Sequence, residues 1–256
     1  MPRSIMSVEL EEALHQDKCP ICRLKYINAE NFLWSLIYDN TSDPGVHKQF
    51  KKSYGLCSDH NQLLIKVIKG RDFLSASSVA RLYESLIPVS LKMLKGLKNK
   101  DSHRLKERIA RLIHFNKNLN KDKNKNDNEI ENTRFKKEKC MVCKTIDQNV
   151  NAFEKTLVEN LKEANFQDLY KKSDGLCLPH FHETINLIRK RDKNIYLFLI
   201  NEQEKKLKNL LINVREVQKK KSYDNFEKVN EDEALSWQEG IWRYTGWKPE
   251  KLLTKD

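Results

Sequence analysis

The chain has 256 residues, is 39% hydrophobic and carries a formal net charge of +12 at pH 7. A chain of this size can bury one large core or two modest ones, which excludes a mini-protein that depends on disulfides. Glycine and proline number only 7 and 6, which favours an all-α fold over a turn-rich β architecture. The sequence shows no bilayer-length apolar run and no signal peptide, so we expect a soluble, cytoplasmic protein with no membrane partner.

Two nearly identical decapeptides indicate an internal duplication. KKSYGLCSDH spans residues 51–60, and KKSDGLCLPH spans residues 171–180. Each follows a CxxC pair that lies more than thirty residues earlier, and together the two copies account for all six cysteines. We therefore predict two copies of one metal-binding helical unit.

Each copy supplies three cysteines and one histidine, which are typical ligands of a tetrahedral zinc site. Gly55 and Gly175 permit a positive-φ turn before the third cysteine, and a following helix would place that cysteine and the histidine on one face. We predict two Zn²⁺ ions, one held within each repeat. The first ligand set is Cys19, Cys22, Cys57 and His60, and the second is Cys140, Cys143, Cys177 and His180.

Other chemistries can use the same residues. An Fe–S cluster with Cys3His ligation is the first alternative, because cysteine spacing alone does not fix the metal. Disulfides are the second, although an intracellular chain would not normally keep them. His182 is a possible replacement for His180, but the first copy has Gln62 at the matching place. Four protein ligands leave no open coordination position, so the predicted sites are structural.

The positive charge lies outside the repeated motifs. Residues 61–139 hold 20 Lys and Arg against 9 Asp and Glu, a net of +11. Part of this excess is HRLKERIARLIHF, residues 103–115, whose spacing predicts an amphipathic helix. Polar, Asn- and Lys-rich sequence follows, so we predict a first unit over residues 1–115, a flexible linker over 116–139 and a second unit over 140–256.

The second unit is predicted to continue into one long helix, from about residue 182 to 221, and to end in a tryptophan-rich segment. Trp237, Trp242, Tyr244 and Trp247 lie within eleven residues, and Gly246 is the expected end of their helix. These aromatic side chains either dock the segment on the helical core or form a partner-binding surface.

The motifs CPIC, GLCxxH and DGLCLPH, the long helix, and the segment YDNFEKVNEDEALSWQEGIWRYTG together resemble a family of uncharacterised bacterial and archaeal proteins. That family is built on two CxxC…GLCxxH units, and the resemblance covers both units and the C-terminal segment. It implies the same eight ligands and no known activity. The Asn- and Lys-rich linker and the strong positive charge depart from the family pattern.

We therefore predict a non-enzymatic zinc protein that binds nucleic acid or a ribonucleoprotein complex through basic helices. The alternative is a protein-interaction adaptor or a homo-oligomeric scaffold. A thiol redox protein is a weaker hypothesis, and no P-loop, nucleophile elbow, dinucleotide fingerprint or HExxH motif is present. The candidate nucleic-acid-binding residues are Lys92, Lys95, Lys98, Lys100, Arg104, Lys106, Arg108 and Arg111.

Overall fold

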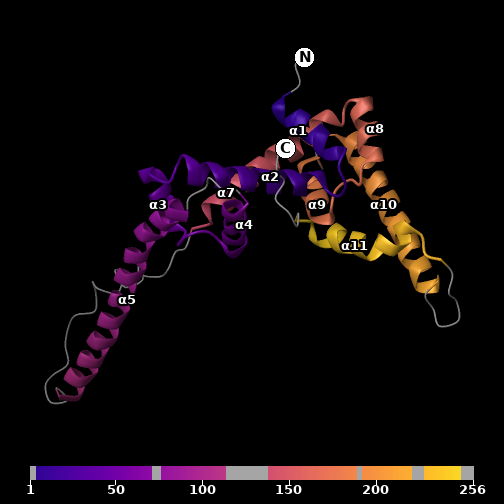
Figure 1. Ribbon diagram of the computed structural model, residues 1–256. Helices are drawn as coiled ribbons and strands as arrows, with labels where there is room; N and C mark the ends of the chain where they lie inside the picture. The colour runs from indigo at the N-terminus through magenta and orange to yellow at the C-terminus, as the bar shows by residue number, and fades with distance from the viewer. Residues whose placement is uncertain (1–3, 71–75, 114–137, 189–191, 221–227, 249–256) are drawn as a thin grey trace. The chain divides into compact units, whose positions relative to one another are not determined.

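A computed structural model describes residues 4–70, 76–113, 138–188, 192–220 and 228–248, without the side chains of residues 97–113 (Figure 1). In these ranges the regular secondary structure consists of ten helices and no strand, which confirms the predicted all-α class. None of these helices combines the length and the apolar character that crossing a membrane requires.

The helices keep the labels of Figure 1. In chain order they are α1 (Ile5–Leu14), α2 (Pro20–Tyr38), α3 (Pro44–Lys52), α4 (Ser58–Lys69), α5 (Ala76–Ile113), α7 (Met141–Asn160), α8 (Ala164–Lys172), α9 (Leu178–Ile188), α10 (Lys193–Lys220) and α11 (Glu231–Thr245).

The predicted duplication is visible in this order, because α2, α3, α4 and α5 correspond to α7, α8, α9 and α10. The first pair has 19 and 20 residues, the second has 9 and 9, and the third has 12 and 11. The turn before each third cysteine is also repeated, with φ of +85° at Gly55 and +72° at Gly175. Both glycines therefore have the conformation that the GLC motif predicts.

The chain divides into two compact units that do not coincide with the two repeats. Unit 1 contains residues 1–32 and 145–256, and unit 2 contains residues 33–144. The boundaries fall inside α2 and α7, so each of these helices begins in one unit and ends in the other. This division differs from the predicted boundaries at 115 and 140, and most of the predicted linker lies outside the described residues.

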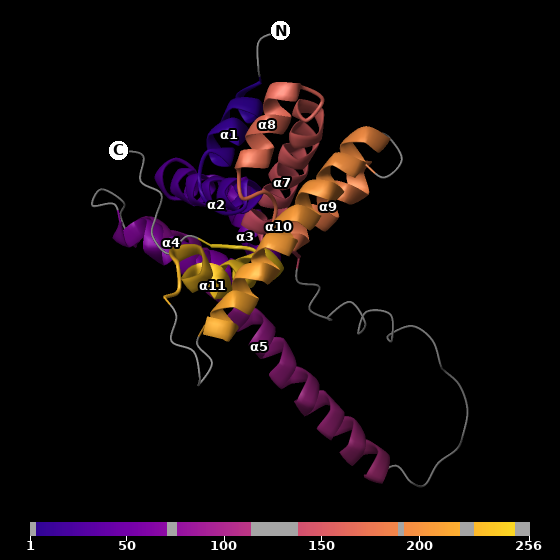
Figure 2. The same cartoon turned by 90° about the vertical axis from the view of Figure 1, so that its right-hand side faces the viewer.

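Unit 1 is built around α9, α10 and α11, which pack against one another, and α1 packs on α8 (Figure 2). Its fully buried side chains include Leu10, Leu157, Tyr170 and Leu199. The predicted long helix is two helices, since α9 ends at Ile188. Asp192 caps α10 instead, because its carboxylate accepts hydrogen bonds from the backbone N–H groups of the second and third residues of that helix.

Unit 2 contains the end of α2, the whole of α3, α4 and α5, and the start of α7. The ring of Phe50 on α3 meets Tyr83 on α5 edge to face, with 5.3 Å between centroids, and Leu82 on α5 is fully buried. Leu86 is the last buried residue described on α5, and Figures 1 and 2 show the helix running on beyond α3 and α4. It forms one helix of 38 residues that runs through Pro88 and takes in residues 103–113 of the predicted amphipathic helix.

Candidate metal centres

The eight predicted ligands lie at the N-termini of four helices. Cys19 and Cys140 come directly before α2 and α7, and Cys57 and Cys177 come directly before α4 and α9. The fourth residue of each motif, three positions later, is in the first turn of its helix. The N-terminus of a helix carries partial positive charge, so the cysteines lie where a metal-bound thiolate is accommodated well.

The structure joins the CxxC pair of each repeat to the CxxH pair of the other. Centre 1 consists of Cys19, Cys22, Cys177 and His180, and centre 2 consists of Cys57, His60, Cys140 and Cys143. All eight predicted ligands therefore lie in one centre or the other, but the prediction that the four ligands of each ion come from one repeat is wrong. Centre 1 belongs entirely to unit 1 and centre 2 entirely to unit 2.

Helix length explains this exchange. The helix that starts at each CxxC has 19 or 20 residues and carries the chain about 30 Å away from its own thiols. The next helix has nine residues and covers only about 14 Å before the compact positive-φ turn. This helix is too short to bring the third cysteine back to the CxxC of its own repeat.

The ligand atoms have the spacing of a single tetrahedral ion. Within each centre the four atoms all lie within 4.8 Å of one another. The Sγ atoms of Cys22 and Cys177 are 3.7 Å apart, and those of Cys57 and Cys143 are 3.6 Å apart. Zinc–sulfur bonds of about 2.3 Å at tetrahedral angles give about 3.8 Å between sulfurs, whereas a disulfide requires about 2.05 Å.

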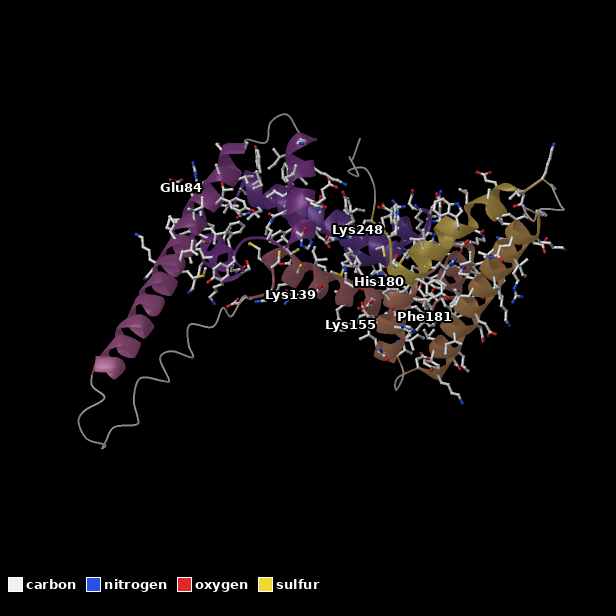
Figure 3. The ribbon with its side chains drawn as sticks, turned by 90° about the horizontal axis from the view of Figure 1, so that it is seen from below. Glu84, Lys139, Lys155, His180, Phe181 and Lys248 are labelled. Carbon is white, nitrogen blue, oxygen red and sulfur yellow. The ribbon has the colours of Figure 1, made fainter. Side chains whose placement is uncertain are left out.

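Both histidines present the same ring nitrogen to the sulfurs. Nδ1 of His180 lies 3.6, 3.4 and 3.2 Å from the Sγ atoms of Cys19, Cys22 and Cys177. In centre 2, Nδ1 of His60 lies 3.1, 3.8 and 3.3 Å from its three thiols, in the order Cys57, Cys140, Cys143. Figure 3 labels His180 where α9 starts. The two centres are thus matched Cys3His groups that can each hold one metal ion.

The thiols of centre 1 do not share one protonation behaviour. Hydrogen bonds from the neighbouring thiols of Cys177 and Cys19 lower the pKa of Cys22 to about 4. Burial raises the pKa of Cys19 well above its usual value. In centre 2, burial raises the pKa of Cys143 to about 12. A metal must displace the protons that these thiols retain, so its affinity falls as pH falls.

A segment that the sequence did not assign to the site covers centre 1. The backbone N–H of Trp247 donates a hydrogen bond to Sγ of Cys22 at 3.3 Å. Gly246 has φ +81°, and a Cβ there would lie 3.4 Å from the same sulfur. Lys18 and Arg23 place their cations 4.9 Å from the centroid of the Trp247 ring. The GW pair after α11 was the only sequence signal for this interaction.

Centre 2 has more exposed ligands. Cys140 is buried, but Cys57, His60 and Cys143 are each partly exposed, whereas all four ligands of centre 1 are buried. Among the hydrogen bonds of the described residues, no backbone N–H donates to a thiol of centre 2. The two centres therefore share a ligand set and differ in their surroundings.

A buried carboxyl group lies near centre 1. Glu154 on α7 is 2% exposed, and its Oε1 has no hydrogen-bond partner. Burial, together with the neighbouring Glu183 carboxylate, raises the pKa of Glu154 to about 8. The residue at the matching place of the first repeat is Leu33, which is fully buried. The repeat aligns the phenylalanines that precede Leu33 and Glu154, but the sequence analysis assigned no role to these two residues.

The candidate nucleic-acid-binding residues all belong to α5. Lys92 and Lys95 are exposed on it. The structure continues the helix to Ile113, but the side chains of the remaining candidates lie outside the described residues. These are Lys98, Lys100, Arg104, Lys106, Arg108 and Arg111.

The tryptophan-rich segment forms α11, which ends at Thr245 with Gly246 as its C-cap, as predicted. Its aromatic residues differ in exposure: Trp242 is buried, whereas Trp237 and Tyr244 are 61% and 64% exposed. The segment therefore docks on unit 1 and also leaves aromatic surface outside.

One family model matches almost the whole chain. It describes a family of unknown function, DUF6062, and matches residues 1–251. The chain belongs to the DUF6062 family. No curated protein and no solved structure matches it. In this DUF6062 chain the paired Cys3His centres are therefore the primary guide to function.

Proposed function

We propose that this DUF6062 protein is a non-enzymatic scaffold, in which one Zn²⁺ ion per centre fixes the helices and α5 binds nucleic acid or a ribonucleoprotein complex. The observation that carries the second half is that α5 leaves the core of unit 2 after Leu86 while its sequence gathers positive charge. The two halves are tested separately.

The donor set supports zinc. Three thiolates and one imidazole form a soft, tetrahedral set of the kind that structural zinc sites use. Ligand atoms within 4.8 Å of one another suit one ion better than a polynuclear iron–sulfur cluster, whose ligands bind separate irons. With four protein ligands the ion has no position left for substrate or water, so its role is to join two helix N-termini.

Metal analysis of protein isolated without chelators from its native cells tests this half. We expect two zinc ions per chain and no visible absorption band. Two irons per chain, or acid-labile sulfide, would show that the centres hold iron and not zinc. A chain that folds without any metal would show that the metal has no structural role.

Charge and exposure on α5 support the second half. Residues 92–111 contain eight Lys and Arg against two acidic residues. The two described lysines of this run, Lys92 and Lys95, are exposed. A long basic helix that leaves the core of its unit can lie along phosphates and bind without reading sequence.

Fluorescence anisotropy with a labelled single-stranded RNA and a labelled DNA duplex, measured from low to moderate salt, tests this binding. Reversing three arginines, with Arg104→Glu, Arg108→Glu and Arg111→Glu together, should abolish most of the affinity of the zinc-loaded chain at low salt. The slope of log affinity against log salt should fall by up to about three, roughly one for each phosphate that is no longer neutralised.

A control of equal charge uses three exposed lysines of unit 1, in the triple variant Lys155→Glu, Lys162→Glu and Lys205→Glu. It should keep most of the affinity. Equal binding by wild type and the arginine variant, or equal losses in both variants, would reject α5 as the nucleic-acid-binding element.

A second candidate function, protein interaction, is favoured by the outward face of α11. Trp237, Ile241 and Tyr244 recur at helical spacing and are 61%, 57% and 64% exposed. The buried face carries polar groups beside the buried Trp242: Glu233 pairs with Lys220 at 2.7 Å, and Arg243 donates to the carbonyl of Asp174. An exposed helix face that presents two aromatic residues and an isoleucine resembles the core of an interface.

Sedimentation of the purified chain, with and without the triple change Trp237→Ala, Ile241→Ala and Tyr244→Ala, tests whether this face joins two copies. A concentration-dependent dimer that survives high salt and disappears in the variant would support this second function. A monomer in both, with no salt-resistant partner retained from native cells, would reject it.

A further inference from the structure

The two centres differ in how well their thiols are shielded from solvent. In centre 1 all four ligands are buried, and the segment at Gly246 and Trp247 lies directly over the sulfur of Cys22. In centre 2 two of the three thiols are partly exposed. We propose that centre 2 is a site of reversible thiol oxidation, at which a hydroperoxide joins two of the metal ligands in a disulfide and releases the ion, while centre 1 stays closed.

Several separate interactions hold the segment of Gly246 and Trp247, the cover of centre 1, in place. The N–H of Trp247 donates to the Cys22 thiolate and so reduces its nucleophilicity. The indole ring is flanked by the cations of Lys18 and Arg23. Lys18 is itself held at φ +69°, with its N–H donating to the carboxylate of Asp174. An oxidant would have to displace this segment before it reached the sulfur.

Centre 2 has the geometry that oxidation requires. Cys57 and Cys143, its two partly exposed thiols, lie with their Sγ atoms 3.6 Å apart. Closing that distance to about 2.05 Å forms a disulfide between neighbours that already face each other.

The reaction balances with the hydroperoxide as the only oxidant. One thiolate attacks the O–O bond of hydrogen peroxide, forming a sulfenic acid and releasing hydroxide. The second thiolate then attacks that sulfur and releases a second hydroxide, so two thiolates lose two electrons and the peroxide gains them. Zinc loses two of its four ligands and dissociates. A dithiol reductant with added zinc restores the centre.

Zinc release from the doubly loaded full-length chain tests the proposal. Hydrogen peroxide is added with a chromogenic zinc chelator, and heavy and light alkylating reagents then mark which cysteines have reacted by mass spectrometry. We expect two phases, with the first ion released at least about tenfold faster than the second. The new disulfide should join Cys57 to Cys143, and dithiothreitol with zinc should restore the thiols.

Two variants of the C-terminal segment test the cover. Trp247→Ala removes the ring that Lys18 and Arg23 flank and should accelerate only the slow phase, severalfold. Leu235→Ala removes an exposed apolar side chain from α11 and should change neither phase. Any of four results would overturn the proposal. Both ions could leave in a single phase, or metal could be lost without thiol oxidation. The first cysteine to react could belong to centre 1 (Cys19, Cys22 or Cys177), or the slow phase could be unchanged in Trp247→Ala.

Discussion

Centre 1 and centre 2 have the same four ligand types at matching places in two copies of one helical pattern. Centre 1 is buried, receives a backbone hydrogen bond from Trp247, and lies near an acid with a raised pKa. Centre 2 leaves Cys57, His60 and Cys143 partly exposed. Duplication therefore preserved the ligands, whereas the covering residues come from segments that the repeats do not share.

The largest expected effect concerns which ligands share an ion. If the pairing is crossed, Cys22→Ser with Cys177→Ser damages one centre and leaves one zinc per chain. Cys22→Ser with Cys57→Ser damages both centres and leaves none. Zinc sites can contribute about 10 kcal/mol or more to the folding of small domains, so each lost ion should also unfold its unit.

Zinc stoichiometry by elemental analysis, with helix content from circular dichroism, distinguishes the two pairings. Pairing within each repeat predicts the reverse result, with no zinc in the first double variant and one ion in the second. Cys140→Ser with Cys143→Ser serves as the control, because both pairings predict that it loses one ion.

Glu154 gives the next largest effect. Its folded pKa of about 8 lies above the unfolded value, so the folded chain holds this proton more tightly. The contribution of Glu154 to stability is therefore greatest at low pH and falls as pH rises from about 4 to about 8. Glu154→Gln should remove that loss and raise the free energy of unfolding by about 1–3 kcal/mol at pH 8.5, with little change at pH 5.

Urea unfolding of zinc-loaded protein at the two pH values measures this effect. Glu159→Gln, at an exposed position on the same helix, should change stability by little at either pH. A Glu154→Gln variant that is less stable than wild type at pH 8.5 would contradict this prediction. It would mean that the Glu154 carboxylate is ionised and paired, so that having glutamate here in place of leucine does not weaken unit 1.

Replacing Gly246 by alanine should lower the free energy of unfolding by about 1–3 kcal/mol, because the φ of +81° and ψ of −178° at this position are nearly confined to glycine. Gly246→Ala also brings a Cβ within 3.4 Å of the Cys22 sulfur. We expect a lower melting temperature and faster loss of zinc from centre 1 to a chelator. Gly240→Ala is the matched control, since its Cβ would meet no atom within 4 Å and α11 should gain stability.

Gly246→Ala with unchanged zinc loss would show that the segment does not protect centre 1. In that case the contrast between the centres would rest on burial alone.

The smallest effect compares the two GLC turns. Both glycines have positive φ, so Gly55→Ala and Gly175→Ala should each cost about 1 kcal/mol. At Gly175 the new Cβ would also lie 2.9 Å from Cε of Lys206, whose ammonium group donates to the carbonyl of Lys171 at 3.1 Å. At Gly55 the nearest atom is 3.5 Å away.

Thermal unfolding should therefore show a larger loss of stability for Gly175→Ala than for Gly55→Ala, by a few tenths of a kcal/mol. The reason is that the flexible Lys206 side chain must move and give up a hydrogen bond. Adding Lys206→Ala to both variants should remove the difference. Equal losses without that change would indicate that backbone strain alone governs both turns.

The sequence predicted what local chemistry controls. Helical composition predicted the fold class, the repeated decapeptides together with the two CxxC pairs predicted all eight residues of the two centres, and the glycines before Cys57 and Cys177 predicted the positive-φ turns. Gly246 likewise marked the end of α11. These features depend on residue type and short spacing, so one chain read alone was enough.

The structure decided what depends on distance through space. The ligand pairing follows from the unequal lengths of α2 and α3, which spacing along the chain does not reveal. The division into units, the break after α9 and the continuity of α5 depend on how helices pack. Trp247 reaches Cys22 across 225 residues, and only tertiary folding brings them together. Sequence therefore determined which residues can bind metal, and tertiary structure determined which of them share an ion and which ion is covered.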